Sequence, residues 1–141
     1  MSGAIRGGRE LQSTYLKIQN YLHREGVDVL DQHVAAENVL EIEMSFSEEE
    51  IYLQDIIWLK ECDGVVAEVS IPSLGVGYEI SYALNTLQKP VLALYREDRE
   101  PISVMILGNV SPLLTICCYR NERELFTFIH RFLGTLSKPA H

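Results

Sequence analysis

Cysteine, basic residues and long apolar runs are all scarce in this sequence, and each shortage excludes a class of protein. Its 141 residues include 3 cysteines, 12 Lys plus Arg and 20 Asp plus Glu, which gives a net charge of -8. Three cysteines, two of them adjacent as Cys117 and Cys118, fit neither a disulfide framework nor zinc-ligand spacing. The acidic balance, with no basic cluster, argues against a protein that coats nucleic acid or an anionic membrane.

Membrane insertion and secretion are not expected either. No apolar run approaches the roughly 20 residues that span a bilayer, and the amino terminus lacks a charged-then-apolar signal segment. We therefore expect a soluble intracellular protein, located in the cytoplasm and also in the nucleus. A hydrophobic content of 47% suffices for one buried core, so residues 1–141 are predicted to form a single domain.

Helical and strand patterns alternate along the chain. Apolar spacing predicts helices over residues 10–24, 47–61, 76–88 and 122–136, with a short one in 101–107 and a loop with some helix over 32–44. β-Branched and apolar runs predict four strands, at residues 27–30, 65–69, 91–95 and 113–119. This alternation predicts an α/β fold, with a parallel sheet and helices on both of its faces. A further strand would ordinarily precede the glycine turn in residues 3–8, but only two residues stand before it, so we expect that first strand to be truncated.

The stretch 67–79 joins a buried strand, a Ser/Pro/Gly turn and the opening of a helix. In parallel α/β sheets such turns form the ligand crevice. Ser73 and Gly75 could donate a hydroxyl and an N–H to a phosphate, and Arg6, beside two glycines, could add a charge-assisted bond. Turn chemistry alone also explains these residues. Neither a Walker loop nor the dinucleotide spacing Gly-x-Gly-x-x-Gly occurs.

Glu79 and Asp55 are the candidate catalytic residues. Glu79 follows the turn at a helix start, where the dipole favours the ionised form that a nucleophile or electrostatic stabiliser needs. Asp55 lies among largely apolar helical neighbours, so it either pairs with a base or serves a site. Two carboxylates that meet in a crevice can cleave a glycosidic bond. The structural alternatives are a dipole-complementing Glu79 and an Asp55 on an exposed helix edge.

His33 is a further candidate, because its imidazole could contact the base of a ligand. A structural or solvent-facing histidine is the alternative. No grouping of His, Cys, Asp and Glu has convincing metal spacing, so we expect no metal and no cofactor.

Several blocks of the sequence together resemble 2'-deoxynucleoside 5'-phosphate N-hydrolases, in the nucleoside 2-deoxyribosyltransferase group. The most specific is Pro-Ser-Leu-Gly-Val-Gly-Tyr-Glu at 72–79, after the strand Val-Val-Ala-Glu-Val at 65–69. Gly-Ala-Ile-Arg-Gly-Gly-Arg-Glu at 3–10, His-Val-Ala at 33–35, Gln-Asp-Ile-Ile-Trp-Leu at 54–59 and Ser-Val-Met-Ile at 103–106 follow the same order as in that family. The resemblance implies a Rossmann-like or flavodoxin-like three-layer fold and a homodimer.

The resemblance also implies an enzymatic activity. Enzymes of this family hydrolyse the N-glycosidic bond of 2'-deoxynucleoside 5'-monophosphates to a free base and 2-deoxyribose 5-phosphate. Glu79 matches the nucleophile that forms a covalent deoxyribosyl intermediate, and Asp55 matches the acid that assists departure of the base. Gly3, Ile5, Arg6, Ser73 and Gly75 match phosphate or sugar contacts. Ser103 matches a serine that reaches the phosphate of the partner subunit.

The chain departs from the family pattern at two places near its start. Ala4 stands where the family usually has serine, and the family's first strand is missing ahead of Gly3. Two enzymatic alternatives therefore stay open, a deoxyribosyltransferase and an N-glycosidase of ribonucleotides such as CMP. A non-catalytic nucleotide-binding dimer is the alternative of a different class.

Overall fold

A three-stranded parallel sheet organises the computed structural model, which describes residues 1–3, 5, 10–31 and 33–136. Its strands are β1 (Val65–Glu68), β2 (Val91–Arg96) and β3 (Leu114–Tyr119), hydrogen-bonded in the order β1-β2-β3. In the register of the sheet, Val91 pairs with Val65 on one side and with Leu114 on the other. β2 is therefore the central strand, and its first four residues are all buried.

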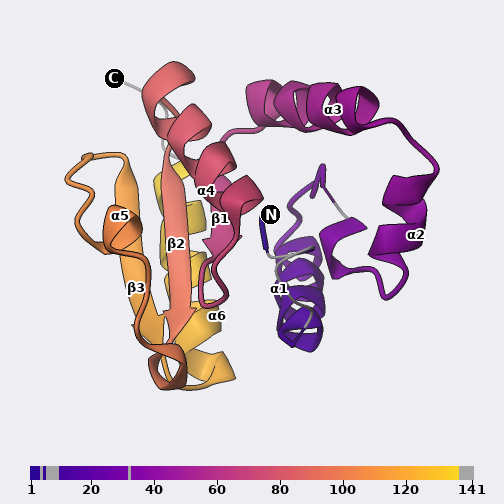
Figure 1. The fold of residues 1–141 in the computed structure, drawn as a ribbon. Coiled ribbons are helices and arrows are strands. Elements are labelled where there is room, and N and C mark those ends of the chain that lie inside the picture. The colour runs from indigo at the N-terminus through magenta and orange to yellow at the C-terminus, as the bar shows by residue number, and fades with distance from the viewer. Residues whose placement is uncertain (4, 6–9, 32, 137–141) are drawn as a thin grey trace.

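Helices cover both faces of the sheet (Figure 1). On one face lie α3 (Glu48–Glu61), α4 (Leu74–Ser81) and α5 (Val104–Leu107), and α4 continues as a π-helical turn, Tyr82–Thr86. On the other face lie α1 (Gln12–Arg24) and α6 (Glu122–Leu136). The short helix α2 (Val39–Met44) and 3-10 turns at His33–Ala35 and Glu97–Arg99 complete the described elements. The predicted α/β fold with helices on both faces is confirmed.

Alternation along the strands explains the two layers. On β1, Val65 and Ala67 face the core that contains Ile56, while Val66 faces the core that contains Ile18. Because successive side chains of a strand point to opposite faces, a strand with apolar residues at every position must be covered on both sides. No helix in the described part of the chain is long and apolar enough to cross a membrane.

The prediction of a strand at residues 27–30 is wrong. This segment has no strand pairing, although Val29 is buried beside Leu22 and Phe132. Its apolar residues are explained by burial in the core and not by pairing in the sheet. Ahead of β1, the described residues form one isolated parallel bridge, between Ser2 and Ala67.

The helix predicted at 76–88 begins two residues earlier, at Leu74. Ser73 is its N-cap, and its hydroxyl accepts a hydrogen bond from the Val76 N–H at 3.3 Å. A serine hydroxyl satisfies one of the N–H groups that the first helical turn leaves unpaired. The cap therefore sets where the helix starts, and Glu79 falls in its second turn.

A buried carboxylate ties together the carboxyl ends of the strands. Glu68, 1% exposed, accepts hydrogen bonds from the Ser70 hydroxyl and from the Tyr119 hydroxyl, the latter at 3.2 Å. Ser70 in turn accepts a hydrogen bond from the Arg96 N–H at 2.8 Å. Burial raises the pKa of Glu68 to about 7, and its hydrogen bonds to Ser70 and Tyr119 offset part of that shift. These contacts link the ends of β1, β2 and β3 just below the turn that leads into α4.

Candidate functional site

The turn between β1 and α4 presents hydrogen-bond donors at the edge of a hollow. Ser73 caps α4 and also lines the hollow, together with Gly75 in the first turn. The first N–H groups of a helix point away from its axis toward the N-terminal side, where the dipole favours negative charge. This end of α4 is therefore suited to an anionic group.

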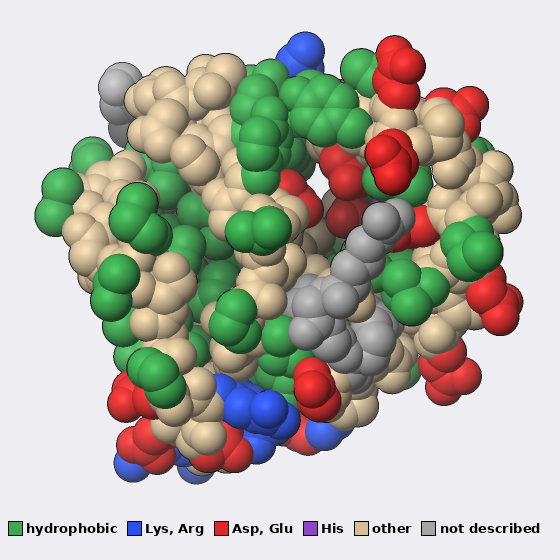
Figure 2. Space-filling model, in the orientation of Figure 1, with side chains coloured by type: hydrophobic (Ala, Val, Ile, Leu, Met, Phe, Trp, Pro, Cys, Tyr) green, Lys and Arg blue, Asp and Glu red, His purple; other side chains and the backbone are tan. Residues whose placement is uncertain are grey.

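The hollow lies between α3 and α4 and has a volume of about 740 Å³. Gly3 and Ile5 line it from the amino-terminal segment, and Asp55 and Glu79 line it from the two helices. Figure 2 shows a hollow on this face of the molecule with acidic side chains at its floor. Gly3 is needed here because an added Cβ would lie 3.0 Å from the ring of Tyr15, which is fully buried.

Glu79 is held in an environment that resists its ionisation. Burial raises the pKa of its carboxyl to about 7, and the negative charges of Asp31 and Asp55 add to the shift. The Ser2 hydroxyl, which has no partner within ordinary hydrogen-bond geometry, is close enough to Glu79 to oppose the shift. The prediction that the helix start favours ionised Glu79 is wrong, because Glu79 lies in the second turn and desolvation outweighs the dipole.

The pKa of Asp55 is shifted in the same direction as that of Glu79. Burial, followed by the negative charge of Asp31, raises the pKa of its carboxyl to about 6, and His33 partly counteracts this. Asp55 is thus not on an exposed helix edge. Two carboxyl groups with raised pKa values that line one hollow are candidates for acid–base chemistry near neutral pH.

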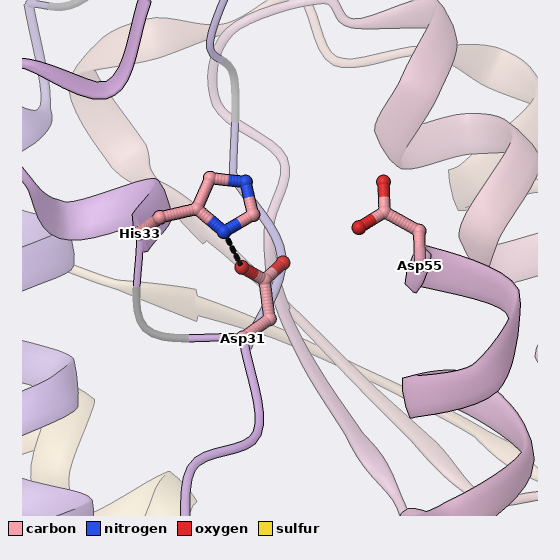
Figure 3. A group of neighbouring side chains, drawn as sticks. All are labelled: Asp31, His33 and Asp55. Carbon is pink, nitrogen blue, oxygen red and sulfur yellow. Dashed lines mark ion pairs between the residues drawn. The ribbon is translucent and has the colours of Figure 1, made fainter. Parts of the chain in front are cut away.

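His33 pairs with Asp31, and the Asp55 carboxyl group is directed toward them (Figure 3). Its Nδ1 lies 2.8 Å from Asp31 Oδ1, and its Nε2 lies 3.8 Å from Glu43 Oε1. The contact with Asp31 raises the pKa of the imidazole despite burial, so the ring favours its cationic form. Its ring also lies 5.7 Å from that of Trp58.

Asp31, His33 and Asp55 are also the group in the described residues whose geometry could hold a metal ion. Their ligand atoms all lie within 4.8 Å of one another. In the structure, His33 Nδ1 pairs with Asp31 Oδ1 within this group, so the imidazole and the carboxyl form an ion pair when the ring is protonated.

The structure brings together most of the site residues predicted from the sequence. One hollow is lined by Gly3, Ile5, Asp55, Ser73, Gly75 and Glu79. His33 contacts Glu43, which lines the same hollow. Ser103 is not among the described residues that line it but is the N-cap of α5. Arg6 and the Ala4 substitution lie outside the described residues.

Sequence reasoning missed four residues of the site. Asp31 and Glu43 surround His33, and Tyr52 meets Tyr78 across the mouth of the hollow, with their hydroxyl oxygens 3.1 Å apart. Tyr52 precedes Asp55 by three residues, a spacing that places both on one side of a helix and could have identified Tyr52 from the sequence. Tyr78 directly precedes Glu79. Glu43 could not have been identified in this way, because the residues around it come from distant segments of the chain.

Comparison with known proteins identifies the class. The family model of nucleoside 2-deoxyribosyltransferases matches residues 1–124, and the chain belongs to this family. A Methanosarcina barkeri protein, provisionally named 2'-deoxynucleoside 5'-phosphate N-hydrolase 1, is 43% identical over 136 residues, which cover 96% of this chain and 84% of that protein. The 5-hydroxymethyl-dUMP N-hydrolase of Mus musculus is 40% identical over 133 residues, with 92% of this chain and 76% of the mouse protein covered. The resemblance inferred from the sequence blocks is confirmed.

A solved structure supports the fold. The CMP N-glycosidase of Clostridium botulinum matches with a TM-score of 0.68 at 21% identity, covering 92% of this chain and 96% of that one. At this identity the likeness concerns the arrangement of sheet and helices. It therefore places the chain in the same fold without transferring a substrate.

Proposed function

We propose that this protein hydrolyses the N-glycosidic bond of 2'-deoxynucleoside 5'-monophosphates and releases the free base and 2-deoxyribose 5-phosphate. The observation that carries the proposal is that Asp55 and Glu79 line one hollow whose edge is the amino end of α4. Relatives that are 40% and 43% identical to this chain over the aligned residues are named as N-hydrolases of such nucleotides. Hydrolysis of such a nucleotide requires carboxyl groups that act on the glycosidic bond and a site that binds the phosphate.

Glu79 is the nucleophile in the proposed mechanism. Its carboxylate attacks the anomeric carbon as the bond to the base breaks, which forms a deoxyribosyl ester on Glu79. Asp55, protonated, donates its proton to the departing base. Asp55 then accepts a proton from water, which attacks the ester, releases the sugar phosphate and restores both carboxyl groups.

The proposed roles require a particular distribution of protons. Burial raises the pKa of both carboxyl groups in the free protein, to about 7 for Glu79 and to about 6 for Asp55, so both the protonated and the ionised form of each are accessible near neutral pH. The reactive form is the one with Glu79 ionised and Asp55 protonated. Positive charge that develops on the sugar in the transition state is stabilised by ionised Glu79, and desolvation makes that carboxylate a reactive nucleophile.

The phosphate is proposed to lie at the amino end of α4. Ser73 and Gly75 line the hollow, so the Ser73 hydroxyl and the Gly75 N–H are the proposed donors, and Arg6 would supply a positive charge. A few oriented donors can hold a phosphate in a protein whose net charge is -8. This arrangement predicts that substrates without the 5'-phosphate bind poorly.

A substrate panel tests the function. We expect base release from 2'-deoxynucleoside 5'-monophosphates, including one with a 5-hydroxymethyl pyrimidine, and release at least about 100-fold slower from the matching nucleosides, because each charge-assisted contact to phosphate contributes about 1.5–3 kcal/mol. Chromatographic quantification of free base measures it. Release from CMP instead of deoxynucleotides would favour a ribonucleotide N-glycosidase, and base exchange on adding a second base would favour a transferase. Thermal stabilisation without turnover would favour a non-catalytic nucleotide-binding protein and contradict the proposal.

The homodimer is proposed on the side of the molecule where α4 and α5 cover the sheet. Leu74 in α4 is 97% exposed, and Val104 and Met105 in α5, next to Ser103, are each 79% exposed. Large exposed apolar side chains such as these are candidates for an interaction surface. A symmetric partner docked here would carry its own Ser103 toward the phosphate end of the neighbouring hollow.

Mixing two inactive variants tests this arrangement. Ser103→Ala and Glu79→Gln each damage every site of their own homodimer. In a mixed dimer, the protomer with intact Glu79 receives Ser103 from its partner, so one site of the two becomes complete. We expect coexpressed, differently tagged variants to recover about a quarter to a half of the wild-type activity, measured after tandem purification. No recovery would show that Ser103 does not act across the interface.

A further inference from the structure

The buried carboxyl group of Glu68 takes no part in the proposed chemistry, yet it lies beneath the turn to which the phosphate is assigned. Glu68 is 1% exposed and Ser70 is 5% exposed, and neither residue lines the hollow between α3 and α4. Burying a carboxyl group costs free energy unless hydrogen bonds satisfy it. The hydrogen-bond partners of Glu68 therefore show which part of the fold it holds in place.

Ser70 joins Glu68 to the end of β2 through its hydroxyl group. The Arg96 N–H can only donate, and it lies 2.8 Å from Ser70 Oγ, which therefore accepts. The single hydrogen of this hydroxyl is then directed to Glu68 Oε1. The Ser70 N–H also lies 3.4 Å from Glu68 Oε2. The carboxyl group of Glu68 thus holds Ser70 by its side chain and by its backbone.

Two residues separate Ser70 from Ser73, and both restrict the chain. Ile71 is buried in a small apolar cluster that includes Leu11. The ring of Pro72 fixes the φ angle of that residue. Because the chain has little freedom between Ser70 and Ser73, the orientation of Ser73 depends on that of Ser70.

Ser73 needs a particular orientation because its hydroxyl group serves two partners. Its oxygen accepts from the Val76 N–H at 3.3 Å, so its hydrogen remains available to a phosphate oxygen. Hydrogen bonds weaken steeply when the donor is misdirected. Gly75 lies in the helical turn that this cap begins, so its N–H depends on the same orientation.

We propose that Glu68 is a positioning residue for phosphate binding, which acts through Ser70 on the orientation of Ser73 and of the first turn of α4. The inference rests on the proposed placement of the phosphate, and it adds a residue that does not contact the substrate. Tyr119 has a different part in the network. Its hydroxyl donates to Glu68 Oε1 at 3.2 Å from the end of β3, so it supports the carboxyl group without contacting the turn.

Binding of 2-deoxyribose 5-phosphate, measured by isothermal titration calorimetry, tests the inference without turnover. Ser70→Ala removes the link to Glu68 and leaves every proposed phosphate donor in the chain. We expect it to weaken binding about 10-fold or more, which is the contribution of one hydrogen bond to a charged group. Ser70→Thr keeps the hydroxyl group and should bind nearly as well as the wild type.

Tyr119→Phe is the matched control, because it removes a hydrogen bond to the same carboxyl group from the side of β3. We expect it to lower the melting temperature and to leave the affinity for 2-deoxyribose 5-phosphate close to that of the wild type. A purely structural role of Glu68 would give both variants the same affinity. That result, or a Ser70→Ala protein that binds as tightly as the wild type, would overturn the inference.

A second pair of variants at Glu68 decides the question if Ser70→Ala does not fold. In Glu68→Gln the amide oxygen can still accept from the hydroxyls of Ser70 and Tyr119, whereas the side chain in Glu68→Met, of similar size, offers no oxygen. We expect weaker binding in Glu68→Met than in Glu68→Gln, and equal affinities would overturn the inference.

Base release distinguishes a failure of this inference from a failure of the proposed function. A wild-type protein that releases base, together with an unchanged affinity in Ser70→Ala, would contradict the role of Glu68 alone. A wild-type protein that releases no base, but whose affinity for 2-deoxyribose 5-phosphate falls in Ser70→Ala and not in Tyr119→Phe, would support the role of Glu68 and contradict the hydrolase. With a nucleotide substrate, Ser70→Ala should raise KM more than it lowers kcat.

Discussion

Replacing Glu79 by glutamine is expected to lower the rate of base release from deoxynucleoside monophosphates by about 10⁴-fold or more. The amide has the shape of the carboxyl group but cannot form the covalent deoxyribosyl intermediate. Losing a nucleophile removes its own step and the contribution of groups that act with it, so the loss is larger than that of a binding contact. Single-turnover measurements of free base, with enzyme in excess, give the rate directly.

Glu79→Gln is also expected to change the stability of the fold, in a way that shows whether the variant is folded. The pKa of Glu79 is raised in the folded protein to about 7 from a usual value of 4.5. Such a group stabilises the fold below pH 4.5, and this contribution is lost as the pH rises through about 7. Glu79→Gln should therefore melt at a higher temperature than the wild type at pH 8 and show little difference at pH 5.

Glu97→Gln is the matched control for this variant. Glu97 is exposed in the 3-10 turn after β2 and does not line the hollow that contains the catalytic pair. It makes the same change of charge, and we expect wild-type rates of base release. If Glu79→Gln releases base as fast as Glu97→Gln does, Glu79 is not the nucleophile.

Asp55→Asn is expected to lower kcat by about 10²–10⁴-fold, because general acid catalysis by a positioned side chain contributes a factor of that size. In the wild type the reactive form carries one proton, on Asp55 and not on Glu79, so kcat/KM should rise and then fall with pH, with both limbs near pH 6 to 7. The fall at higher pH reports the loss of the proton from the general acid. In Asp55→Asn this basic limb should be lost, and only the rise with ionisation of Glu79 should remain.

The leaving group separates this role from a merely structural one. A base that departs readily as an anion needs little protonation, so its nucleotide should lose much less activity in Asp55→Asn than a nucleotide with a poor leaving group. The pH profile and the two substrates are measured as kcat and KM separately. An equal loss for both substrates, with the basic limb retained, would contradict the assignment of Asp55 as the acid.

The local elements of this protein could be predicted because their causes are local. Helical spacing located α1, α3 and α6, and the β-branched runs located β1, β2 and β3. The segment 27–30 shows the limit of this reasoning, since Val29 is apolar because it packs against α6 and not because it pairs in a sheet. The predicted start of α4, at residue 76, is two residues late, because the N-cap formed by Ser73 begins the helix at Leu74.

The candidate site was likewise predictable from the sequence only in part. The block at residues 72–79 and the pattern around Asp55 identified both carboxylates and the turn of Ser73 and Gly75, because the short-range order of the chain encodes a strand, a turn and a capped helix. Ionisation could not be inferred, since the raised pKa of Glu79 depends on burial and on Asp31, 48 positions away in the printed sequence.

The sequence by itself thus determined the alternation of strands and helices, the family and the two carboxylates of the hollow. Only the tertiary structure decided that Glu79 lies in a second helical turn with a raised pKa, and that Asp31 and Glu43 hold His33 beside Asp55. The physical reason is that desolvation and charge coupling depend on distances between segments remote in sequence, whereas capping and periodicity depend on near neighbours.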